Sequence, residues 1–112
     1  MQFKAEVVEG VIVVNVGLIR ATLQEAEEFK ELLTKNIELG KRNLVVDLSA
    51  CEFIDSTFLG TLVVALKKVT SLGGDLRLVG FHPAVQSMFE LTRMYRVFET
   101  FGTPEEAIES FK

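Results

Sequence analysis

Short runs of β-branched and other apolar residues alternate with longer stretches of helical periodicity along this 112-residue sequence. Strands that alternate with helices favour crossover connections, which are right-handed in nearly all proteins and build mostly parallel sheets. The predicted element order is β-β-α-β-α-β-α-β-α. We therefore predict an α/β fold in which a mixed, mostly parallel β-sheet is packed with about four α-helices, in one domain that spans residues 1–112.

The strands are predicted where β-branched or continuously apolar runs meet turn residues. One such run, which follows Gly10, is expected to pair with the run before it as a hairpin across Glu9-Gly10. A continuous apolar run indicates a strand that is covered on both faces. The expected strands are Phe3–Val8, Val11–Val16, residues 43–48, residues 76–79 and residues 96–101.

The helices are predicted from apolar residues that recur at three- and four-residue steps. In residues 22–39 the repeating positions are Leu23, Ala26, Phe29, Leu33 and Ile37. A second helix at 58–72 is so apolar in its first half that most of it should be buried. Pro83 opens a third helix, and Thr103-Pro104-Glu105-Glu106 has the composition of a capping box that begins a fourth.

Composition narrows the classes of partner and compartment. A net charge of −4 argues against nucleic acid as a direct partner, because such proteins usually carry a basic face. No run of 18 apolar residues is present, so we expect no membrane partner, and residues 1–8 do not have the pattern of a signal peptide. Cys51 is the single cysteine and cannot form an internal disulfide, which favours a cytoplasmic location.

Catalytic and cofactor-binding patterns are missing from the sequence. His82 is the single histidine, so neither a hydrolytic triad nor a closed zinc site with Cys51 is supported. Neither the P-loop pattern nor the Gly-x-Gly-x-x-Gly pattern occurs. We predict no enzymatic activity, no cofactor and no metal, and we expect Cys51 to be a buried or half-buried small apolar residue rather than a nucleophile.

Residues 48–60 leave a predicted strand, cross a short loop and begin the most apolar helix. Asp55, Ser56 and Thr57 are the polar residues at the start of that helix. One of them can simply be an N-cap, since the first N–H groups of a helix need acceptors. Alternatively the site is functional, because a phosphoryl group on a serine there would lie at a helix amino end, which favours anions.

Three motifs carry a resemblance to a known family. They are Val45-Val46-Asp47-Leu48-Ser49, then Phe53-Ile54-Asp55-Ser56-Thr57, then Leu59-Gly60. The Gly73-Gly74 turn into the next strand and the helix that begins at Pro83 agree as well. Together they resemble the STAS domains of bacterial anti-sigma factor antagonists, and the predicted element order is similar to the family fold over essentially the whole chain.

The resemblance implies a partner-switching mechanism. In this family the unphosphorylated antagonist binds an anti-sigma factor, which is commonly also a serine kinase that uses ATP, and so releases a sigma factor. A serine phosphatase restores the binding form. The implied phosphoacceptor is Ser56, with Thr57 as the less favoured acceptor. The residues implied to contact the partner are Asp55, Ser56, Thr57, Phe58 and Arg20.

Two residues depart from the family pattern. Phe58 replaces the usual glycine, and it either fills the core or adds an apolar contact for a partner. Arg20 stands where the family often has an acid. Two other functions also remain open. A STAS domain can be a subunit of a signalling scaffold or of a lipid-transport complex, and a small α/β domain can bind a nucleotide or another ligand.

Overall fold

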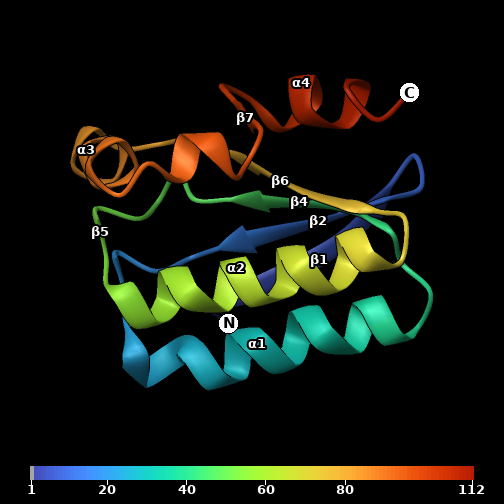
Figure 1. Ribbon diagram of the computed structural model, residues 1–112, viewed down its shortest axis with the longest axis horizontal. Coiled ribbons are helices and arrows are strands. Elements are labelled where there is room, and N and C mark those ends of the chain that lie inside the picture. The colour runs from blue at the N-terminus through green and yellow to red at the C-terminus, as the bar shows by residue number, and fades with distance from the viewer. Residues whose placement is uncertain (1) are drawn as a thin grey trace.

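A computed structural model describes residues 2–112 and has a five-stranded sheet with helices on both faces (Figure 1). The strand order is β1-β2-β4-β6-β7, in which β1 is antiparallel to β2 and every other neighbouring pair is parallel. The predicted fold class is confirmed. The strands are β1 (Phe3–Val8), β2 (Val11–Val16), β4 (Asn43–Asp47), β6 (Asp75–Val79) and β7 (Thr100–Phe101).

The first two strands form the predicted hairpin, in which Val8 pairs with Val11. Its turn residues, Glu9 and Gly10, both have positive φ values of 51° and 82°. Two consecutive positive φ values are typical of the two-residue turns whose twist matches that of the flanking strands. Glycine adopts this conformation without steric cost, which explains the choice of Gly10 at the second turn position.

The four helices are divided between the two faces of the sheet. Figure 1 shows α1 and α2 side by side along one face, and α4 on the other. α3 lies toward the end of the sheet to which the arrowheads of β2 and β4 point. The helices are α1 (Leu23–Glu38), α2 (Ser56–Ser71), α3 (Pro83–Leu91) and α4 (Pro104–Glu109).

Side-chain caps define where these helices begin. Thr22 and Glu25 form a complete capping box on α1, in which the Thr22 N–H donates to the Glu25 carboxylate at 2.9 Å. At α4 the Thr103 hydroxyl accepts from the Glu106 N–H at 3.2 Å. The Glu106 carboxylate, however, accepts a hydrogen bond from the Thr103 hydroxyl rather than from the Thr103 N–H. The predicted cap of α4 is therefore confirmed, but only one half of the predicted box forms.

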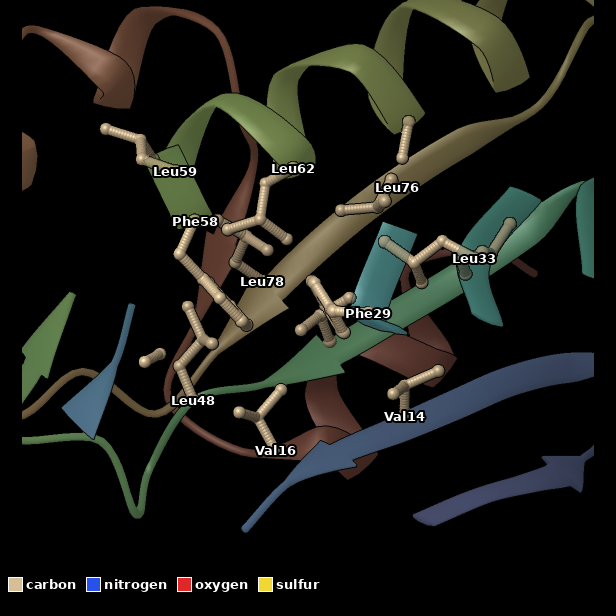
Figure 2. Packing of buried hydrophobic residues seen from close by; sticks show 14 of the residues in the cluster. Val14, Val16, Phe29, Leu33, Leu48, Phe58, Leu59, Leu62, Leu76 and Leu78 are labelled. Atoms are coloured by element: carbon tan, nitrogen blue, oxygen red, sulfur yellow. The ribbon is translucent and has the colours of Figure 1, made fainter. Parts of the chain in front are cut away.

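Three stacked phenylalanine rings lie at the centre of the core between the sheet and the helix pair. The Phe29 and Phe58 rings are nearly parallel, with centroids 4.6 Å apart, and Phe3 lies 5.1 Å from Phe29. Figure 2 shows Phe29 and Phe58 among valine side chains of β2 and leucine side chains of α1, α2 and β6. A smaller apolar cluster on the other face joins Val13 and Val45 to Ile108 of α4.

Phe58 is fully buried, so it fills the core. Of the two readings of this residue, the prediction that its side chain contacts a partner is wrong. Leu23 is also corrected. The helical spacing places it on the apolar face of the first helix, but its side chain is 66% exposed. It occupies the first position of α1, at the end of the helix, where it is not covered by the core.

Three local elements differ from the predictions. The strand expected at 96–101 is limited to β7, because residues 94–96 form a short 3₁₀ turn after Arg93, whose φ is 60°. In that turn the Phe98 N–H donates to the Met94 carbonyl. This N–H is therefore not available to pair with a neighbouring strand. Two strands of two residues each, β3 (Arg20–Ala21) and β5 (Phe53–Ile54), were not predicted.

Replacing Phe58 with alanine should lower the free energy of unfolding by about 3–5 kcal/mol, because it removes a buried ring and leaves a cavity beside Phe29. The sequence contains no tryptophan, so urea unfolding should be followed by far-UV circular dichroism. Leu91→Ala is the matched control. That side chain is 85% exposed, and its loss should change stability by about 0.5 kcal/mol or less. Equal effects of the two variants would contradict the packing described here.

Candidate functional site

The loops that precede α1 and α2 lie side by side because β3 and β5 pair in parallel. Arg20 is opposite Phe53, and Ala21 is opposite Ile54. One further bond continues this pairing, since the Asp55 N–H donates to the Ala21 carbonyl at 3.1 Å. The two longest helices therefore begin next to each other at one end of the molecule, and both positive helix ends point to the same region.

Asp55 caps both of these helices with one carboxylate. Its Oδ1 accepts the Phe58 N–H at 2.9 Å, which is the N-cap bond of α2. Its Oδ2 accepts the Leu23 N–H at 2.8 Å, which is the first N–H of α1. The N-cap reading of the Asp-Ser-Thr sequence is thus correct for Asp55. The two bonds give the carboxylate a structural role and leave the next two residues available.

Ser56 and Thr57 are the first two residues of α2, and both side chains are exposed. Neither hydroxyl forms a hydrogen bond with another group of residues 2–112. The first turn of the helix contains no acidic side chain of its own. The hydroxyl groups therefore lie at a helix amino end, facing solvent, where an added anion is electrostatically favoured.

The start of the loop before this helix is held by Asp47 at the end of β4. This carboxylate is 9% exposed and accepts the N–H of Ser49 at 2.9 Å and also its hydroxyl. Gly80, with a φ of 73°, packs directly against the same turn, and a Cβ there would lie 2.6 Å from the Cβ of Ser49. The loop is thus fixed at Asp47 and again at Asp55, which restricts where Ser56 can lie.

Exposed apolar side chains surround the same end of the molecule. Ile19 is 59% exposed, Leu23 66% and Phe53 39%. The Arg20 guanidinium covers part of the Phe53 ring, with its central carbon 4.2 Å from the ring centroid. We call Ile19, Leu23 and Phe53 the apolar rim. Sequence reasoning missed it, because the two-residue strands that carry Phe53 and Arg20 are too short to show an alternating pattern.

Four of the five residues predicted to contact a partner converge at this end of the molecule. Asp55, Ser56 and Thr57 form the start of α2, and Arg20 lies on the paired strand beside them. Phe58 points into the core instead. The site thus combines exposed hydroxyls, a cation and the apolar rim, which is the composition of a protein-docking surface rather than of a catalytic cleft.

Cys51 is fully buried, as expected from the sequence. Burial, together with the nearby Asp47 carboxylate, raises the pKa of its thiol to about 11. The thiol is therefore protonated at neutral pH and is a poor nucleophile. Within residues 2–112, no group of three or more histidine, cysteine or acidic side chains is placed to hold a metal ion. None of the helices described is long and apolar enough to cross a membrane.

A mostly parallel sheet with a helix pair on one face, and a half-buried Asp55 followed by the exposed Ser56 and Thr57 where the second of these helices begins, is the arrangement of a STAS domain. Residues 2–107 match the STAS domain family, and the chain belongs to that family.

Relatives with similar chains are named as sigma-factor regulators. A Thermotoga neapolitana protein named "putative anti-sigma factor antagonist" is 32% identical over 96% of this chain and 95% of its own. The crystal structure of a Thermotoga maritima protein with the same description has a TM-score of 0.88 at 28% identity, covering 96% of this chain and 92% of that one. The anti-sigma factor antagonist SpoIIAA in its unphosphorylated form, at 19% identity and a TM-score of 0.84, shares the fold over 97% and 95% of the two chains.

Removing the Asp55 carboxylate should loosen both long helices. We expect Asp55→Ala to lower the free energy of unfolding by about 2 kcal/mol, because it leaves the N–H groups of Leu23 and Phe58 without their acceptor. Asp55→Asn is the matched control, since an amide has one acceptor oxygen and can retain one of the two caps. Urea unfolding should place Asp55→Asn between wild type and Asp55→Ala. Identical stability of Asp55→Asn and wild type would contradict the double cap.

The Cys51 thiol should react slowly in the folded protein. At pH 8 we expect its reaction with a disulfide reagent to be about 100-fold slower than in the urea-unfolded chain, since the pKa rises from 9.0 to about 11. Because the pKa of the Cys51 thiol is higher in the folded state, ionisation of this thiol favours the unfolded chain. Its stabilising contribution to the free energy of unfolding is therefore fully present below pH 9 and is lost as the pH rises toward 11. Cys51→Ser supplies the background rate. Equal rates in folded and unfolded protein would show that the thiol is exposed.

Proposed function

We propose that this protein is an anti-sigma factor antagonist that is switched by phosphorylation of Ser56. In the unphosphorylated form it binds an anti-sigma factor that is also a serine kinase, and a sigma factor is thereby released. Phosphorylation by that kinase ends the binding, and a serine phosphatase restores it. The observation that carries the proposal is the Ser56 hydroxyl, which is exposed at the amino end of α2 beside the apolar rim.

The family and its relatives support the regulatory part of this proposal. The chain belongs to the STAS family, and the similar Thermotoga proteins are named for antagonism of anti-sigma factors. Such antagonists are typically regulators rather than enzymes. We therefore assign the chemistry of the switch to the kinase and phosphatase, with this chain as their protein substrate.

The geometry supports a switch that acts on the interface rather than on the fold. A phosphoryl group adds about two negative charges, and the adjacent helix end can accommodate them for about 0.3–1 kcal/mol or somewhat more. SpoIIAA in its phosphorylated form shares this fold with a TM-score of 0.76, so the fold is compatible with a phosphoryl group. A partner surface built around a neutral hydroxyl and the apolar rim would instead have to bury an unpaired charge.

Kinase treatment should place one phosphate on Ser56. The protein is incubated with its cognate anti-sigma factor kinase and ATP, and the site is mapped by mass spectrometry. Ser56→Ala should retain binding to the kinase and lose the modification, because the apolar rim is unchanged and the hydroxyl is absent. Thr57→Ala is the matched control on the neighbouring exposed hydroxyl, and it should be phosphorylated like wild type. Phosphate found mainly on Thr57 would overturn the assignment.

Measurements on the phosphorylated protein should show whether phosphorylation changes partner binding or the stability of the fold. We expect phosphorylation to weaken binding to the anti-sigma factor by about 100-fold or more, since a buried unpaired charge costs several kcal/mol and each 1.4 kcal/mol is tenfold. The melting temperature of the same sample should change by only a few degrees. A loss of affinity together with a collapse of the melting temperature would mean that phosphorylation unfolds the domain.

A further inference from the structure

The guanidinium of Arg20 carries a positive charge that no carboxylate neutralises. It lies over the Phe53 ring at 4.2 Å, but it forms no ion pair and no hydrogen bond with any group of residues 2–112. Arg77 shows the contrast, since it also lies over an aromatic ring and in addition pairs with Asp75 at 3.0 Å and bonds to Ser110. Arg20 therefore keeps its guanidinium donors available while the ring holds the group in place.

Arg20 also lies close to Ser56. It is the residue directly opposite Phe53 in the β3–β5 pair, and Phe53 precedes Ser56 by three residues. Three residues of chain span at most about 11 Å, and the turn at Asp55 shortens this distance. Phe53, Arg20 and Ser56 are all exposed, and the Asp55 N–H, next to Ser56, donates to the carbonyl of Ala21, next to Arg20, at 3.1 Å. A long arginine side chain and a phosphoryl group that extends the serine can therefore meet across the Phe53 ring.

We propose that Arg20 binds the phosphoryl group of phosphorylated Ser56, an inference that rests on the proposed function of Ser56. The planar guanidinium can donate two parallel hydrogen bonds to two phosphate oxygens, a geometry that lysine cannot match. Phosphorylation then removes a cation from the docking surface at the same time as it adds an anion. It also draws Arg20 away from Phe53, so a partner that docks on the unphosphorylated form loses the Arg20 contact and meets the phosphate in its place.

Other charged groups near the site oppose this pairing. Asp55 is adjacent in the chain, and its carboxylate is already occupied by two backbone N–H groups. Glu25 accepts the N–H of Thr22 on the paired loop, and Glu52 is exposed next to Phe53. These carboxylates disfavour the doubly charged phosphate, whereas Arg20 favours it. Because the carboxylates are the same in every Arg20 variant, differences between variants report Arg20 alone.

The test is a ³¹P NMR titration of the protein with phosphoserine at position 56, introduced by genetic incorporation so that no kinase is needed. In Arg20→Ala the pKa of the phosphoserine should rise by about 0.5 unit, because an exposed opposite charge is lost. Arg20→Lys should fall between that variant and wild type. Lys35→Ala removes one exposed cation from the far end of α1, about 18 Å along the helix, and should leave the phosphoserine pKa unchanged.

A second measurement keeps Arg20 and compares the protein with and without phosphate on Ser56. In ¹⁵N spectra the side-chain Nε–H signal of Arg20 should shift when Ser56 carries phosphate, and the shift should follow the titration of the phosphate. An unchanged phosphoserine pKa in Arg20→Ala, or an unmoved Nε–H signal if that variant does not fold, would overturn the inference. The proposed function fails separately, because it requires that the kinase modify Ser56, whereas this titration tests a phosphoserine already in place.

Discussion

Both long helices of this domain begin at the carboxylate of Asp55. One oxygen accepts the N–H of Phe58 in α2, and the other accepts the N–H of Leu23 in α1. The pair of bonds joins segments that are 32 residues apart in the chain and sets two positive helix ends beside each other. The exposed Ser56, the apolar rim and the position of Arg20 all depend on that junction, because each of them lies within a few residues of it.

The first turn of α2 places two exposed hydroxyl residues directly before a core residue. Ser56 and Thr57 face solvent, while Phe58 stacks on Phe29 in the core. Successive residues of a helix point in directions that differ by about 100°, so neighbours in sequence can face opposite environments. A phosphate on Ser56 can therefore change the surface without disturbing the aromatic stack, and the ring of Phe58 can anchor the helix without touching a partner.

In the proposed switch, Arg20 would give the surface around Ser56 a charge that depends on phosphorylation. Stacked on Phe53, it presents a cation beside the apolar rim, which suits a partner with an acidic group at the matching position. Paired with a phosphate, it would be partly neutralised and reoriented.

The sequence by itself determined the features that depend on neighbouring residues. The Glu9-Gly10 turn, the cap at Thr103, the α/β class and the place of Ser56 at a helix start all follow from local conformational and hydrogen-bonding preferences. Only the tertiary structure decided the β3–β5 pair, the second bond of Asp55, the outward position of Leu23 and the inward position of Phe58. These features depend on contacts between distant segments, and a two-residue strand or a single carboxylate leaves no periodic pattern in the sequence from which such contacts can be inferred.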